Sequence, residues 1–292
     1  MSSNPRLPPE LCDRIIDQLR DRPKALRVCS VVSKSWTSRS RKHIFSTVSF
    51  NGDRDIVAWG NAFPDPSNSP AHHARQLVVS YRGEFPENHL VSFCNVTCLL
   101  LHVHAFNGRT TSLTQLHGFT PLLKSLTMSF HVLPFTDVLS LVYSFPLLDD
   151  LTLIGLPTAS DTKITSPVSP MFSGKLYLAV VQAMGTVVDD LLSLPSGIHF
   201  RELIMHWMCE EDLPSMMDLI SACSRTLEDL QILNHAKRTC SWSLPRLSGS
   251  SLSVDRRKHR RFAGPLLRDQ PQIHRCSLRD VEFQRRLDHS CG

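Results

Sequence analysis

Apolar side chains recur at helical spacing near the start of the chain. Four of them fall at offsets of zero, four, five and eight residues and so share one face: Leu11, Ile15, Ile16 and Leu19. Pro8 and Pro9 suit the first positions of this helix, where a missing N–H costs nothing. The pattern ends near Asp21, and Pro23 can open a second helix.

The second predicted helix carries another apolar face. Its members recur at offsets of three, three and four residues: Leu26, Cys29, Val32 and Trp36. Val28 and Val31 widen the stripe, and a basic, polar stretch follows before Ile44 and Phe45 return to apolar character. A segment of about forty residues buries little more than half of its surface, so some of these side chains need a cover. That cover is either a separate partner or the domain that follows, and the spacing leaves both open.

After a short apolar strand at residues 47–50, a pattern of one Leu and a second apolar residue two positions later repeats along the chain. The first position is occupied by Leu77, Leu99, Leu126, Leu151, Leu176, Leu203 and Leu230. The second is occupied by Val79, Leu101, Met128, Leu153, Leu178, Met205 and Ile232. Successive spacings are 22, 27, 25, 25, 27 and 27 residues, within the period typical of leucine-rich repeats.

Two residues of a strand that are two positions apart point to the same face. Between the strands, residues 136–145, 187–192 and 212–223 have helical spacing, with Asp212 at the start of the last segment. The sequence therefore predicts an irregular array of parallel strands and helices, stacked as a solenoid because each unit needs a neighbour to cover its apolar face. An ordinary α/β domain with leucine-rich strands is the alternative.

Two segments do not fit this pattern. Residues 157–174 are rich in Pro, Ser and Thr and predict a surface loop inserted in the array. From residue 240 the repeat is lost, and a basic cluster follows: Arg256, Arg257, Lys258, Arg260 and Arg261. Such a cluster is typical of a nuclear-localisation signal or a nucleic-acid patch, or of a solvated tail with no such role.

The net charge of +5 divides unevenly along the chain. Residues 1–43 hold ten Lys or Arg against four acids, residues 44–236 hold nine against eighteen, and residues 237–292 hold thirteen against five. A nucleic-acid-binding body would carry a basic stripe within its fold. The acidic middle argues against that class, so nucleic acid is not the expected partner.

Several function classes lack their sequence signals. No basic start followed by an apolar run and no stretch of about 18 apolar residues occurs, so we expect a cytoplasmic or nuclear protein with no membrane partner. The nine cysteines are an odd number without a paired pattern and predict reduced thiols. The motifs of metalloproteases, α/β-hydrolases and phosphate-binding loops are missing, so we expect no enzyme, metal or cofactor.

The N-terminal segment resembles the F-box motif over about thirty residues. The opening Leu-Pro-x-Glu-Leu matches at Leu7, Pro8, Glu10 and Leu11, the Ile-Ile-x-x-Leu continuation at Ile15, Ile16 and Leu19, and the Val-x-x-x-Trp ending at Val32 and Trp36. Two features depart from the motif: Ser33 stands where many members carry Cys, and residues 21–25 resemble an insertion. With the repeats behind it, the chain resembles fungal F-box proteins with C-terminal irregular leucine-rich repeats.

The resemblance implies a three-helix module at residues 1–46 that docks a Skp-type adaptor and, through it, a cullin. The adaptor-facing residues would be Leu7, Pro8, Leu11, Ile15, Ile16, Leu26, Val31, Val32 and Trp36. Trp36 also suits the core of the module itself. Residues 47–239 would then be the array that holds an unknown protein target, and 240–292 a poorly ordered basic tail. The alternatives are an F-box scaffold outside any ligase, or a nucleic-acid- or chromatin-associated protein that works through the tail.

Overall fold

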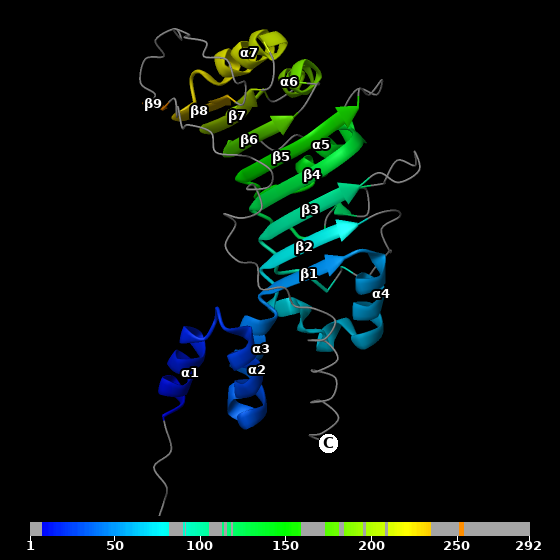
Figure 1. The fold of residues 1–292 in the computed structure, drawn as a ribbon, viewed down its shortest axis with the longest axis vertical. Coiled ribbons are helices and arrows are strands. Elements are labelled where there is room, and N and C mark those ends of the chain that lie inside the picture. The colour runs from blue at the N-terminus through cyan, green and yellow to red at the C-terminus, as the bar shows by residue number, and fades with distance from the viewer. Residues whose placement is uncertain are drawn as a thin grey trace, which may run out of the picture. The chain divides into compact units, whose positions relative to one another are not determined.

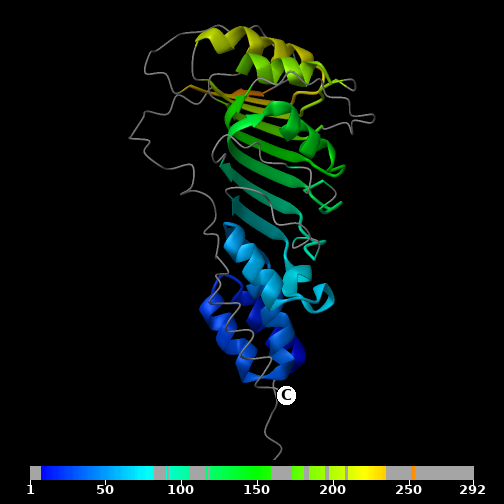
Figure 2. The same cartoon turned by 90° about the vertical axis from the view of Figure 1, so that its right-hand side faces the viewer.

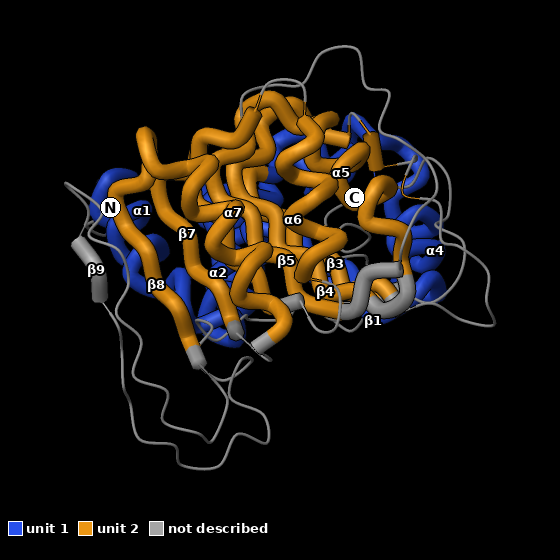
Figure 3. The backbone as a smooth tube through the Cα atoms, turned by 90° about the horizontal axis from the view of Figure 1, so that it is seen from above, with its two compact units in different colours: residues 1–79, 86–96, 262–292 blue, residues 80–85, 97–261 orange. Residues whose placement is uncertain are grey.

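The computed structural model divides the chain into two compact units (Figure 3). The structure describes residues 8–81, 90, 92–104, 113, 116–117, 119–158, 173–180, 184–194, 197–207, 210–234 and 251–253. Of these, the residues up to Val79 and those from Leu90 to Val96 form unit 1. Unit 2 comprises Ser80, Tyr81 and the described residues from Thr97 onward.

Unit 1 opens with three helices, α1 (Pro9–Gln18), α2 (Pro23–Val32) and α3 (Lys34–Ile44) (Figure 1). The two helix starts at prolines are as predicted. The predicted second helix is wrong at its C-terminal end, because Ser33 adopts an extended conformation (φ −151°, ψ 138°) and stops the helix. Trp36 therefore lies on α3. Helical spacing continues across Ser33 in the sequence, so periodicity alone did not reveal this break.

The rest of unit 1 contains two adjacent strands with a helix and two 3-10 turns between them. They are β1 (Thr47–Asn51), α4 (Asp53–Ala62), η1 (Pro66–Asn68), η2 (Pro70–His73) and β2 (Gln76–Tyr81). The strand predicted at residues 47–50 is confirmed, whereas α4 was not predicted. The first positions of α4 carry Asp53 and Asp55, where acidic side chains favour a helix N-terminus.

An aromatic cluster forms the core of this part of unit 1. The Trp59 ring of α4 makes edge contacts with Phe45 and Phe50, at centroid distances of 6.0 and 5.7 Å. Phe93 packs against both Phe50 and Trp59, at 5.8 and 5.5 Å. Edge-to-face packing suits the ring quadrupoles and adds to the free energy gained by burying large apolar surfaces.

Unit 2 is built on seven hydrogen-bonded strands in sequential order (Figure 1). They are β3 (Cys98–His104), β4 (Ser125–Pro134), β5 (Asp150–Thr158), β6 (Lys175–Val180), β7 (Glu202–Trp207), β8 (Asp229–Asn234) and β9 (Ser251–Ser253). Each described pairing between them is parallel. The predicted α/β class with a mostly parallel sheet is therefore shown.

The repeated leucines pair with one another across this sheet. In the register of the strands, Leu99 lies opposite Leu126, and the row continues through Leu151, Leu176, Leu203 and Leu230. The second apolar positions form a parallel row in the same way, from Leu101 to Ile232. The repeated leucine positions of the sequence are therefore paired with one another across these six strands. From Leu99 to Leu203, every leucine of the first row is at least 99% buried.

Three helices lie on one side of the unit 2 sheet (Figures 1 and 2), and the burial of the leucines indicates that they face these helices. They are α5 (Phe135–Tyr143), α6 (Met184–Leu192) and α7 (Leu213–Cys223). All three helical segments were predicted, and Asp212 occupies the N-cap position of α7. Each helix turns a stripe of buried apolar side chains to its neighbours, and α6 packs against both α5 and α7. The other face of the sheet carries the alternate positions.

The limits of the array differ from those predicted. Strand β5 continues to Thr158, and Gly174 is buried, so the inserted segment does not occupy the whole of residues 157–174. Strand β9 pairs with β8 so that Leu252 lies opposite Leu230, which adds a strand beyond residue 239. The sheet is open. In the part of the chain that the structure describes, some connections between consecutive strands contain a helix and others do not. The even winding of a regular solenoid is therefore not seen there.

Candidate partner-binding surface

Helices α1 and α2 expose aliphatic side chains to solvent. On α1, Leu11 and Ile15 lie one turn apart, and each is 44% exposed. On α2, Val28, Val31 and Val32 are 60%, 49% and 62% exposed. Pro8, at the N-cap of α1, is exposed as well. We call these six residues the aliphatic set.

Two of the residues expected to face a partner lie in the interior of unit 1 instead. Ile16 of α1 and Leu26 of α2 are completely buried, so they stabilise the module and offer no surface. Trp36 is partly buried on α3, and Leu7 lies outside the described residues. The expectation was wrong for Ile16 and Leu26 because each apolar stripe is wider than the area that the rest of the unit covers. Its buried and exposed residues then follow the same helical spacing.

A polar contact fixes the face that α1 turns outward. The Arg39 guanidinium of α3 donates two hydrogen bonds to the Asp17 carboxylate of α1, with Nε–Oδ1 at 2.7 Å and Nη2–Oδ2 at 2.5 Å. His43 Nε2 lies 2.7 Å from Asp17 Oδ1. The hydrogen bonds from Arg39, then those from His43, hold the pKa of Asp17 well below its usual range. The bidentate geometry restricts the rotation of α1 on α3.

Helix α2 packs on α3 through the side opposite its valines. Leu26 and Ser30, one turn apart, are its buried residues. The Thr37 hydroxyl of α3 donates to the Ser30 carbonyl oxygen at 2.8 Å, and the Ser30 hydroxyl donates to the Arg27 carbonyl oxygen at 2.7 Å. With this side occupied, Val28 and Val32, also one turn apart, lie on the other. Val28 was not among the residues expected to face a partner, and helical spacing alone could not have assigned it, because the buried Leu26 and Ser30 have the same spacing.

The aliphatic set can bind an apolar groove. Full burial of one Val, Leu or Ile side chain contributes about 1.5 kcal/mol or more, and a few such anchors dominate the affinity of a helix docked in a groove. Comparisons of the chain with protein-family models, with curated proteins and with solved structures find no match.

The described residues bear only in part on the basic cluster, on metal binding and on membrane spans. Residues 256–261, the basic cluster, lie outside the described residues. Within the described ranges, no group of three or more His, Cys, Asp or Glu side chains is arranged to hold a metal ion. In the same ranges, no helix has the length and apolar character needed to cross a bilayer.

Proposed function

We propose that helices α1–α3 are an F-box module that docks a Skp-type adaptor, and that unit 2 is an irregular leucine-rich-repeat array that holds a protein target for ubiquitin transfer. The observation that carries the proposal is the exposure of Leu11, Ile15 and Val32, three positions of the F-box-like motif, together with the neighbouring Val31. A self-contained cap would bury these side chains. Exposed apolar patches on a folded protein commonly mark interaction sites.

The proposed mechanism is tethering, without catalysis by this chain. The F-box module would bring the target, through the adaptor and a cullin, close to the charged conjugating enzyme. Tethering two binding partners converts a bimolecular encounter into an intramolecular one and raises the effective concentration of the target lysines. The leucine rows of unit 2 support an array with a rigid sheet, on whose free face a target can bind.

Co-purification of the full chain with a Skp-type adaptor tests the proposal. We expect the wild-type chain to retain the adaptor, and the double substitution Leu11→Asp/Ile15→Asp to abolish retention, because two charges would have to be buried in an apolar groove. The matched control is Val57→Asp on α4, an aliphatic residue of unit 1 that is 42% exposed and lies outside the aliphatic set.

The outcomes separate docking from loss of folding. Thermal unfolding of all three proteins should give similar midpoints, because the substituted side chains are already in contact with solvent. A wild-type chain that does not retain the adaptor, or a Val57→Asp variant that fails as completely as the double variant, would contradict the assignment.

A further inference from the structure

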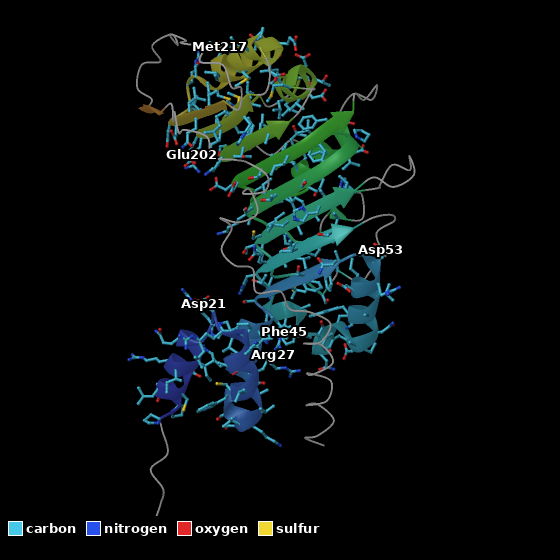
Figure 4. The ribbon with its side chains drawn as sticks, in the orientation of Figure 1. Asp21, Arg27, Phe45, Asp53, Glu202 and Met217 are labelled. Carbon is cyan, nitrogen blue, oxygen red and sulfur yellow. The ribbon has the colours of Figure 1, made fainter. Side chains whose placement is uncertain are left out.

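On the face of the unit 2 sheet opposite the leucines, the first residues of β5, β6, β7 and β8 form a row of charged side chains. The register places Asp150 beside Lys175, Lys175 beside Glu202, and Glu202 beside Asp229. We call these four residues the carboxylate row. Adjacent strands are about 4.8 Å apart, so the row extends about 14 Å across the sheet. Glu202, labelled in Figure 4, lies at the first position of β7.

The carboxylate row contains three carboxylates and one ammonium group. Lys175 Nζ lies 3.5 Å from Glu202 Oε2. The Ser125 hydroxyl reaches Asp150 Oδ2 at 3.4 Å, and Gln231 Nε2 donates to Asp229 Oδ2 at 3.0 Å. Neutral donors do not cancel charge, and Lys175 is the sole Lys or Arg among the described residues of this face. The row therefore has an excess of negative charge.

The Asp150 carboxyl group is the partly buried start of this row. Burial raises the pKa of its carboxyl group, and the negative charges of Asp149 and Glu202 raise it further, while Lys175 and Ser125 act in the opposite direction. Arg201, the residue before Glu202, is already engaged, since its Nη2 lies 2.9 Å from Asp149 Oδ1 and its Nε donates to the Ser173 carbonyl oxygen. An incoming cation would stabilise the charged form of the Asp150 carboxyl group, which burial disfavours.

An aromatic ring lies next to the carboxylate row on the same face. Tyr177 follows Lys175 by two positions on β6, a distance of about 7 Å along the strand. Its hydroxyl is hydrogen-bonded to Nε2 of His206, whose side chain is 93% buried, and the ring centroids are 5.1 Å apart. This bond holds the Tyr177 ring in place. A fixed tyrosine ring beside carboxylates attracts a cation through its π face and packs against the aliphatic stem of Lys or Arg.

We infer that this sheet face binds an arginine- or lysine-bearing segment of a protein, with cationic groups on the carboxylate row and a side-chain stem against Tyr177. That the segment belongs to a ubiquitylation target rests on the proposed function. Arginine suits the row best, because its planar guanidinium makes two parallel hydrogen bonds to a carboxylate. Opposite charges on the row and the segment would also steer their encounter and favour this partner over an acidic one.

Fluorescence anisotropy with the purified full chain tests the inference. The probes are two labelled peptides of equal length, one alternating arginine with glycine and the other alternating glutamate with glycine. The row variant is Asp150→Asn/Glu202→Gln/Asp229→Asn. Its control, Asp189→Asn/Glu211→Gln/Asp218→Asn, removes the same charge from exposed positions on α6, on the 3-10 turn η4 (Glu210–Asp212) and on α7.

We expect the chain to bind the arginine peptide and not the glutamate peptide. The row variant should weaken that binding by about tenfold, while the control stays within about twofold of wild type. Tyr177→Ala should lower the affinity, and Tyr177→Phe, which keeps the ring, should lower it less. The Asn and Gln replacements keep side-chain size, and unchanged thermal midpoints would show that the variants are folded.

Three results would overturn the inference. They are no binding of the arginine peptide, equal binding of the glutamate peptide, and equal loss in the row and control variants, which would indicate diffuse attraction to an acidic surface. No adaptor is present in this assay, so its failure leaves the adaptor-docking proposal standing. Failure to retain the adaptor would in turn leave the peptide site intact.

Discussion

The helices α1 and α2 and the sheet of unit 2 use the same aliphatic residues in opposite ways. In the sheet, Leu126, Leu151 and Leu176 lie side by side in register and are at least 99% buried. On the helices, Leu11 and Val32 remain in contact with solvent, although their helical spacing resembles that of the buried Ile16 and Leu26. Repeated strands bury one another's leucines, because each copy of the strand lies beside the next. Two short helices lack such neighbours.

The two regions also differ in what sets their geometry. In the sheet, the register brings backbones into close contact, as at Gly155, where an added Cβ would lie 1.9 Å from the carbonyl oxygen of Phe130. In the helical module, a polar contact between Asp17, Arg39 and His43 orients α1. Added volume is therefore expected to destabilise the sheet, whereas loss of the Asp17 charge is expected to loosen α1 locally.

The largest expected effect is that of adding a methyl group within the sheet. Gly155 has φ +151°, and Gly155→Ala would force both a strained backbone and a shift of β4 or β5. We expect a loss of about 4 kcal/mol in the free energy of unfolding. Gly185→Ala is the control, because its Cβ would lie 3.4 Å from the Ser215 hydroxyl and alanine favours a helix. Urea denaturation measures both, and equal stabilities would contradict the close approach.

The next effect separates the buried and exposed sides of α2. Leu26→Ala should cost about 3 kcal/mol, because it leaves a cavity at a fully buried position. Val32→Ala, on the 62% exposed side, should change the free energy of unfolding by less than about 0.5 kcal/mol. The same denaturation measurement compares them. A large loss from Val32→Ala would place that side chain in a core and would remove the basis for the aliphatic set.

The smallest expected effect is local to α1. Asp17→Asn removes the charge that accepts the bonds from Arg39 and His43, so we expect faster amide hydrogen exchange in α1 and little change in the overall thermal midpoint. The side chains of Arg39 and Asp17 are each more than one-third exposed, so solvent weakens the contribution of this ion pair to the free energy of unfolding.

The pH dependence of this contact has a defined sign. The pKa of Asp17 is depressed in the folded state, so its stabilising effect is complete above the unfolded value of about 3.9 and is lost as the pH falls below it. Exchange in α1 of the wild type, corrected for intrinsic rates, should therefore hold steady from pH 7 to 5 and increase below about pH 4. Asp17→Asn should lack this increase, and an identical profile in both proteins would contradict the contact.

Particular residues show how far the sequence could predict this fold. The leucine positions from Leu99 to Leu230 predicted the parallel strands, because a two-residue alternation marks one buried face and a steady repeat marks successive units. The same rule extends to Leu252, which lies 22 residues after Leu230, within the period of the array, and was missed because its neighbours are mostly Ser and Gly. The stop at Ser33 was missed because it depends on backbone conformation and not on apolar spacing.

The candidate surface was predictable in its composition but not in its orientation. The sequence by itself determined that α1 and α2 carry more aliphatic side chains than they can bury, and that the strands share one leucine-bearing face. Only the tertiary structure decided that Ile16 and Leu26 are interior while Leu11, Ile15 and the three valines are exposed. The physical reason is that periodicity is a property of neighbouring residues, whereas the side of a helix that is covered depends on distant ones. Arg39 and His43 fix the orientation of α1 from 22 and 26 residues beyond Asp17.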